Sequence, residues 1–232
     1  AGRITAVISY FGYARQDRKA RARDPISAKL VANLITVAGA DRVLTMDLHV
    51  PQLQGFFDIA VDHLLGVPIL AEYFKQKFSS YDDVVIVSPD VGSVTRARKF
   101  AERLEAPIAI VDKRRPKSNE CEVMNIIGEV ANKKAILVDD LIDTAGTIVN
   151  AAEALYKQGA KEIYACATHG VLSGPAIERI KNSMIKELVL LNTIPLTEEK
   201  KIDKIVSISV APIFAEAIER IYGDMSLSSL FT

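Results

Sequence analysis

The segment Ala135-Ile-Leu-Val-Asp-Asp-Leu-Ile-Asp-Thr-Ala-Gly-Thr147 decides the fold of this chain. Its first four residues are apolar, as in a strand that is covered on both faces of a sheet. Asp139 and Asp140 follow directly, and we expect the strand to end there. The loop Asp143–Thr147 then opens a helix that we expect to start near Ile148. A buried strand, a short loop and a helix in this order predict a unit of an α/β sheet.

The residues of this loop fit the binding of a phosphate. In open α/β sheets ligands bind beyond the carboxyl ends of the strands, where a helix N-terminus offers N–H groups and a partial positive charge. Gly146 allows close approach of the backbone, and Thr144 and Thr147 add hydroxyl donors. The alternative is that Asp143 and Thr147 only cap the helix and that Asp139 is an acid at the end of a strand. The whole string fits a phosphate site with a neighbouring acid for sugar hydroxyls or a metal better than it fits capping.

Outward from this segment, apolar β-branched runs alternate with segments of helical periodicity. The alternation predicts an α/β fold, with doubly wound domains and mainly parallel sheets. The expected strands are Ile4–Ser9, Arg42–Met46, Val84–Val87, Ile108–Val111, Ala135–Val138, Ile163–Ala167 and Leu188–Leu191. The expected helices have apolar faces within Ile26–Ala38, Val94–Leu104, Ile148–Leu155, Ile177–Met184 and Ile213–Ile221.

The periodic pattern lapses between Asp58 and Pro68, and we place the domain boundary in this stretch. Residues 1–64 are expected to be the remainder of an N-terminal domain, and residues 65–232 a C-terminal domain that contains the phosphate loop. Because the chain opens almost at once in a strand, we expect the first domain to be incomplete and to lack its N-terminal portion.

Composition excludes several classes of protein. The 232 residues include 29 Lys and Arg against 29 Asp and Glu, so no bulk positive field favours nucleic acid. No segment approaches the roughly 20 apolar residues of a membrane span, and no signal peptide is recognisable. Cys121 and Cys166 provide no disulfide framework and fit a reducing compartment. We expect a cytoplasmic protein that binds neither membrane nor nucleic acid.

A basic segment near the start of the chain predicts a nucleotide site. Six Arg and Lys residues lie within the first 23 positions, and Tyr10, Phe11 and Tyr13 stand among them. Aromatic and guanidinium faces stack on a nucleobase, and Arg15 and Gln16 can hydrogen-bond it or its phosphates. A solvated basic loop is the plain alternative, and single-stranded nucleic acid is a weaker rival ligand.

Two further segments follow predicted strands. His49 and Asp90 could hold a magnesium ion that arrives with a nucleotide, although His49 taken alone is better explained as a structural histidine. The charged stretch Asp112–Glu120, which includes Lys113 and Arg115, predicts a loop that closes over phosphates, with a solvated turn as the alternative.

These motifs together resemble one family. Val138-Asp-Asp-Leu-Ile-Asp-Thr-Ala-Gly-Thr147 looks like the ribose-5-phosphate loop that type I phosphoribosyltransferases share with ribose-phosphate pyrophosphokinases, also called phosphoribosyl pyrophosphate (PRPP) synthetases. The basic segment, the strand-end pair and the cationic loop are similar to the pyrophosphokinases. Thr168–Pro175 and Ser226–Phe231 extend the resemblance over essentially the whole chain.

The resemblance implies an activity and a role for each matching residue. The implied reaction transfers the β,γ-diphosphoryl group of ATP to the 1-hydroxyl of ribose 5-phosphate, giving PRPP and AMP. The implied cofactor is Mg²⁺, the implied assembly a homohexamer built from dimers, and the implied effectors inorganic phosphate and ADP. The implied residues are Arg15 and Gln16 for ATP, His49 and Asp90 for the metal, Lys113 and Arg115 for catalysis, and Arg115, Asp139, Asp143, Thr144, Ala145, Gly146 and Thr147 for ribose 5-phosphate.

Two departures from the family pattern affect these expectations. Ser93 stands where the family usually has glycine, so we expect the backbone to have less conformational freedom at this position. Members of the family also have an N-terminal portion with a Phe-Ser-Asp-Gly-Glu motif that this chain lacks, so we expect it to bind ribose 5-phosphate even if it fails to turn over alone. A phosphoribosyltransferase and a non-catalytic PRPP-synthetase-associated subunit are the alternatives.

Overall fold

The computed structural model describes residues 2–114 and 123–230, and the chain divides into two compact units. The first unit contains residues 1–66 and 210–232, and the second contains residues 67–209. The boundary after Gly66 falls within the stretch where the sequence pattern lapses. The expected division into 1–64 and 65–232 differs from this grouping at the C-terminal segment, which belongs to the first unit.

The first unit is built on a parallel three-stranded sheet in the order β1-β2-β3. Phe11, Leu53 and Phe57 lie in its core with Val43 of β2, and the rings of Phe11 and Phe57 are 5.6 Å apart between centroids. The Arg3 guanidinium donates to the Ile221 carbonyl at 2.6 Å and to Asp224 at 3.2 Å, which ties the C-terminal segment to the start of the chain. The elements of this unit are β1 (Thr5–Ile8), α1 (Ser27–Val37), β2 (Arg42–Met46), η1 (Pro51–Phe56), β3 (Ala60–Leu64), α6 (Ala211–Tyr222) and η3 (Ser228–Leu230).

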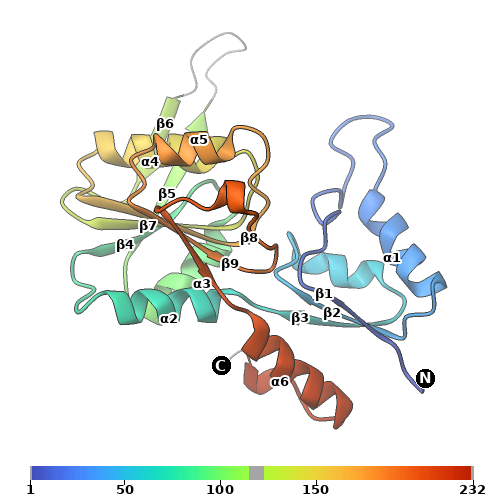
Figure 1. Cartoon of the computed structure of the whole chain (residues 1–232). Helices are drawn as coiled ribbons and strands as arrows, with labels where there is room; N and C mark the ends of the chain where they lie inside the picture. The colour runs from blue at the N-terminus through green and yellow to red at the C-terminus, as the bar shows by residue number, and fades with distance from the viewer. Residues whose placement is uncertain (1, 115–122, 231–232) are drawn as a thin grey trace. The chain divides into compact units, whose positions relative to one another are not determined.

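The second unit contains a seven-stranded sheet in the order β10-β9-β8-β7-β4-β5-β6. All neighbouring strands are parallel except β5 and β6, which are antiparallel. Helices α4 and α5 cover one face of this sheet, and α2 and α3 cover the other (Figure 1). Its elements are α2 (Val67–Lys77), β4 (Val84–Ser88), α3 (Val94–Leu104), β5 (Ile108–Arg114), β6 (Val123–Ile127), β7 (Lys134–Ile142), α4 (Gly146–Lys157), β8 (Glu162–Gly170), α5 (Ala176–Lys181), β9 (Glu187–Leu191), η2 (Glu198–Lys200) and β10 (Ile205–Ile208).

Burial of the central strands confirms the α/β prediction with mostly parallel sheets. Every residue of β4 is buried, as are Ala135–Val138 of β7. Strands covered on both faces read as continuous apolar runs, which is the pattern in the sequence. Within the described ranges, no helix combines the length and the apolar character that a membrane span requires.

The structure corrects two boundaries at the phosphate loop. Strand β7 continues to Ile142, so Asp139 and Asp140 lie within it and do not follow its end. Residues 134–142 pair with β8 as far as Ile142 opposite Gly170, and these ladder hydrogen bonds extend the strand past its acidic residues. Helix α4 begins at Gly146, two residues before the expected start.

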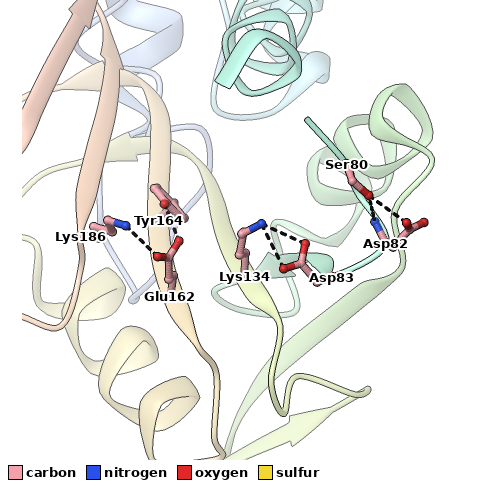
Figure 2. Close-up of polar contacts among 7 residues, drawn as sticks. All are labelled: Ser80, Asp82, Asp83, Lys134, Glu162, Tyr164 and Lys186. Atoms are coloured by element: carbon pink, nitrogen blue, oxygen red, sulfur yellow. Dashed lines mark hydrogen bonds and ion pairs between the residues drawn. The ribbon is translucent and has the colours of Figure 1, made fainter. Parts of the chain in front are cut away.

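Ion pairs lie at the amino-terminal edge of the same sheet, where β7 and β8 begin. Figure 2 shows Glu162, at the start of β8, accepting from Lys186 and from the Tyr164 hydroxyl, both at 2.7 Å. The Lys186 ammonium and the Tyr164 hydroxyl hold the pKa of Glu162 below its ordinary value. Lys134, at the start of β7, pairs with Asp83 at 3.0 Å. This edge therefore presents balanced charges.

Candidate active site

The opposite edge of the second sheet gathers the polar residues that follow its strands. Strand β4 ends at Ser88 and its neighbour β7 at Ile142, so Asp90 and the loop Asp143–Thr147 leave the sheet on the same side. Carboxyl ends of adjacent parallel strands are the usual place for a ligand in an α/β sheet. The second unit therefore brings Asp90 to the same edge as those described residues that were predicted to bind ribose 5-phosphate.

The loop Asp143–Thr147 has the geometry of an anion site. Thr144 and Thr147 are exposed, whereas the methyl group of Ala145 is buried. Ala145 precedes the first turn of α4 with a φ of 61°, a left-handed conformation that alanine rarely adopts. The first N–H groups of a helix have no acceptor within it, and the helix dipole favours an anion beside them.

The N-cap position of α4 is occupied by Ala145, which has no side-chain oxygen to cap the helix. The Asp143 carboxylate accepts a hydrogen bond from the Ser173 hydroxyl. Thr147 lies inside the first turn of the helix, and capping by Asp143 remains the alternative to a role in phosphate binding.

The chain that follows β8 supports the loop through four hydrogen bonds. Leu172 N–H donates to the Ile142 carbonyl at 3.1 Å, and Ser173 N–H donates to the Asp143 carbonyl at 3.0 Å. The Ser173 hydroxyl donates to the Asp143 carboxylate. Arg179 of α5 donates to the Thr144 carbonyl at 2.9 Å. The sequence pattern assigned no role to Ser173 or Arg179.

Next to the loop, Ser93 joins two carboxylates. Its N–H donates to Asp90 Oδ1 at 2.8 Å, and its hydroxyl donates to Asp139 Oδ1 at 3.1 Å. The Asp140 N–H donates to the same oxygen of Asp139 at 2.9 Å. Ser93 has φ −88°, so a serine adopts the local backbone without strain. The departure from glycine thus adds a hydrogen-bond bridge.

The environment of Asp139 disfavours its negative charge. Burial, together with the neighbouring charges of Asp140 and Asp90, raises the pKa of Asp139 to about 8. Like charges that share a site hold a proton until a cation or a donor neutralises them. Asp139 therefore holds its proton more tightly than an exposed aspartate does.

The donor set fits magnesium bound together with a substrate. Among the described residues, no group of three or more His, Cys, Asp or Glu side chains could hold a metal ion by itself. Mg²⁺ is usually bound by one or two carboxylates together with substrate phosphates and water, not by an all-protein cage. Asp90, held by Ser93 beside the other carboxylates, is suited to that mode. His49 is exposed and belongs to the first unit.

The predicted nucleotide residues also lie in the first unit. Arg15 and Gln16 have exposed side chains in the turn that follows the buried Phe11, and the Gln16 carbonyl accepts the Ala28 N–H at 3.2 Å. Their backbone is thereby tied to the start of α1. His49, Arg15 and Gln16 belong to the first unit, and Asp90 belongs to the second.

The two predicted catalytic bases fall at the limit of the described residues. Lys113 lies in β5 opposite Met124 of β6, and its side chain is not among those described. Arg115 lies outside the described residues. Their proposed roles rest on the sequence.

A doubly wound, mostly parallel sheet whose central strand leads into a short loop at a helix N-terminus defines a phosphoribosyltransferase-like α/β protein. A family model described as the N-terminal domain of ribose phosphate pyrophosphokinase matches residues 1–39, and one described as the phosphoribosyl synthetase-associated domain matches residues 113–232. The chain belongs to the ribose-phosphate pyrophosphokinase family.

Individual relatives agree with this assignment. The ribose-phosphate pyrophosphokinase of Clostridium acetobutylicum is 71% identical over the whole chain, which covers 72% of that relative. The one from Caldanaerobacter subterraneus subsp. tengcongensis is 74% identical over the whole chain, which covers 73% of it. The crystal structure of phosphoribosylpyrophosphate synthetase from Mycobacterium smegmatis has a TM-score of 0.91 and 43% identity, covering 97% of this chain and 73% of that one.

Proposed function

We propose that the protein is a ribose-phosphate diphosphokinase, which transfers the β,γ-diphosphoryl group of ATP to the 1-hydroxyl of ribose 5-phosphate and produces PRPP and AMP for nucleotide biosynthesis. The observation that supports this most is the loop Asp143–Thr147 at the N-terminus of α4, in a chain of this family. A loop that binds a terminal phosphate fixes the sugar from its 5-end and leaves the anomeric hydroxyl available for attack.

The sugar site is formed by the loop and the neighbouring strand. The N–H groups of the first turn of α4 and the hydroxyls of Thr144 and Thr147 bind the 5-phosphate. Asp143 and Asp139 accept hydrogen bonds from the sugar hydroxyls, and Ala145 and Gly146 let the backbone follow the phosphate. Arg115 adds a cation to this site.

The roles proposed for the nucleotide residues rest on the resemblance of the sequence. Arg15 and Gln16 bind ATP, and Asp90 with His49 would hold the Mg²⁺. Bound there with the nucleotide, the metal would neutralise charge on its phosphates. Asp90 is oriented for this by the Ser93 N–H.

Catalysis then requires no protein nucleophile. The anomeric hydroxyl attacks the β-phosphorus of ATP in line, its proton leaves, and AMP departs as the diphosphoryl group moves in one step. Lys113 and Arg115 stabilise the charge that develops on the phosphoryl oxygens and on the leaving AMP. Such donors act through positioning and electrostatics, and removal of one typically costs about 10²–10³ in rate.

The remaining family properties extend the proposal. We expect a homohexamer built from dimers, regulation by inorganic phosphate and ADP, and a cytoplasmic location, with neither nucleic acid nor membrane as a partner.

The first test is AMP formation from ATP and ribose 5-phosphate with no nucleobase supplied. AMP release supports the diphosphokinase. Consumption of PRPP with a base, and no AMP release, would identify a phosphoribosyltransferase instead.

The second test separates binding from turnover by calorimetric titration. Asp143→Ala should weaken ribose 5-phosphate binding more than ATP binding. Equal losses for the two ligands would contradict the sugar site. Tight ribose 5-phosphate binding without any AMP release would favour a non-catalytic subunit.

A further inference from the structure

The segment that follows β8 reaches the phosphate loop through three successive carbonyl groups. The carbonyls of Ile142, Asp143 and Thr144 accept, in that order, from Leu172 N–H, Ser173 N–H and the Arg179 guanidinium, at 3.1, 3.0 and 2.9 Å. Three consecutive peptide groups are thus held from one side.

Holding a carbonyl also fixes the direction of the next N–H. No cis peptide occurs among the described residues, and in a trans peptide the C=O of one residue and the N–H of the next point in opposite directions. The bonds to the Asp143 and Thr144 carbonyls therefore turn the N–H groups of Thr144 and Ala145 away from the segment after β8. That is the direction in which an anion on the far side of the loop would accept them.

This arrangement opposes local backbone preferences. Ala145 and Leu172 both adopt left-handed conformations, with φ of 61° and 51°. A non-glycine residue in this conformation is strained, and the conformation persists only where surrounding contacts enforce it. Here the contacts are those from Ser173 and Arg179, and the Ser173 hydroxyl also donates to the Asp143 carboxylate.

Arg179 places a positive charge at the same loop. Its Nη1 lies 3.4 Å from the position that a Cβ on Gly146 would occupy, so the guanidinium sits against the first residue of α4. A cation at this distance also favours an anion bound on the other side of the backbone.

We propose that Ser173 and Arg179 are positioning residues of the ribose 5-phosphate site, which orient the peptide groups of residues 143–145 before the sugar phosphate binds. The inference rests on the proposed function, because it specifies how that site is preorganised. It assigns a role in ligand affinity to α5 and to the loop before it, although neither residue needs to touch the ligand.

The experiment compares Ser173→Ala and Arg179→Ala with the unmodified protein, by calorimetry with ribose 5-phosphate and ATP and by steady-state kinetics. Ser173→Ala keeps the backbone bond to the Asp143 carbonyl and removes the hydroxyl bond that holds the Asp143 carboxylate, whereas Arg179→Ala removes the bond to the Thr144 carbonyl. Each variant should raise the Kd and KM for ribose 5-phosphate about tenfold, in keeping with loss of one orienting hydrogen bond. The corresponding values for ATP should stay within about twofold, at a cost below roughly 0.5 kcal/mol.

Matched variants separate positioning from general destabilisation. Arg179→Lys keeps a charged donor and should recover part of the loss, and Ser173→Thr keeps the hydroxyl and should recover most of it. Lys181→Ala removes an exposed cation from the same short helix and should leave both affinities unchanged. Thermal unfolding reports whether a variant has lost its fold.

Three outcomes would overturn the proposal. The first is unchanged ribose 5-phosphate affinity in both alanine variants while Asp143→Ala weakens it, which refutes the positioning role and leaves the proposed function intact. The second is an equal loss for ATP and ribose 5-phosphate. The third is failure of the unmodified protein to bind ribose 5-phosphate, which would refute the proposed function itself.

Discussion

Replacing Asp139 by asparagine should make the protein more stable while weakening its sugar site. In the folded protein burial and the charges of Asp140 and Asp90 raise the pKa of Asp139 from 3.8 to about 8. Between these two values the folded state holds a proton that the unfolded chain releases, so this group makes the free energy of unfolding fall as the pH rises. Asparagine is neutral throughout and removes that dependence.

The size of the effect follows from the same pKa values. At about 1.4 kcal/mol for each pKa unit, a rise from 3.8 to about 8 corresponds to at most about 6 kcal/mol near pH 8. Asp139 is only partly buried and shares its interactions with Asp140, so we expect a gain of about 1–3 kcal/mol. The amide oxygen of the introduced asparagine can still accept from Ser93 and from the Asp140 N–H, so no buried donor is left without an acceptor.

Urea unfolding with a metal chelator, at about pH 8 and about pH 5, measures this gain. The advantage of Asp139→Asn should be largest at the higher pH and should shrink toward the ordinary pKa of an aspartate. A loss of stability near pH 8, or the same gain at both values, would refute the electrostatic reasoning. In parallel, ribose 5-phosphate binding should weaken, because the amide presents one acceptor where the carboxylate presents two.

Three further predictions concern other parts of the second unit. Lys113→Ala should lower kcat at least about a hundredfold with little change in KM, and a large KM change with near-normal kcat in steady-state assays would contradict its role. Glu162→Gln should reduce the free energy of unfolding by about 0.5–1 kcal/mol at neutral pH. Because the pKa of Glu162 is lowered in the folded state, urea unfolding curves should show this difference disappearing in acid. A difference that persists in acid would exclude the ion pair as its cause. Gly170→Ala should destabilise by about 1–3 kcal/mol, since the new Cβ would lie 2.6 Å from Leu190 Cδ1, and an unchanged thermal midpoint would show that Leu190 can move aside.

The fold class could be predicted from the apolar runs, but strands β3, β6 and β10 and helix α2 were missed. Strand β3 was missed because Asp62 and His63 interrupt its pattern, and only the fold supplies their partners. Arg42 pairs with Asp62 at 2.6 Å, and His63 accepts the Leu48 N–H at 2.9 Å. Polar residues whose hydrogen-bond partners are distant in the sequence give no local pattern from which a strand could be predicted.

Helix α2 was missed although its signal is present. Val67, Leu70, Ala71 and Phe74 are all buried and have helical spacing. Pro68 suggested an irregular stretch, yet proline is well tolerated in the first turn of a helix, where its missing N–H has no acceptor.

In the candidate site, too, residues that are contiguous in the sequence were predicted, and residues that only folding brings together were not. The phosphate loop is contiguous, so its residues and spacing were visible in the sequence. Ser93, Ser173 and Arg179 act on residues 46, 30 and 35 positions away, and chain folding alone brings them there. The strand end was misplaced because ladder pairing with β8 carries β7 past Asp139 and Asp140.

The two edges of the seven-stranded sheet, at the amino and the carboxyl ends of its strands, should differ in their response to mutation. At the edge that begins with Lys134 and Glu162, opposite charges already compensate one another, so substitutions there should register in denaturation curves and leave ligand titrations untouched. At the other edge, the charges of Asp140 and Asp90 lie close enough to raise the pKa of Asp139, so substitutions there should also change ligand titrations. Substitutions that change ligand specificity would then be expected at the carboxyl edge of the sheet, while the residues of the amino-terminal edge keep the fold stable.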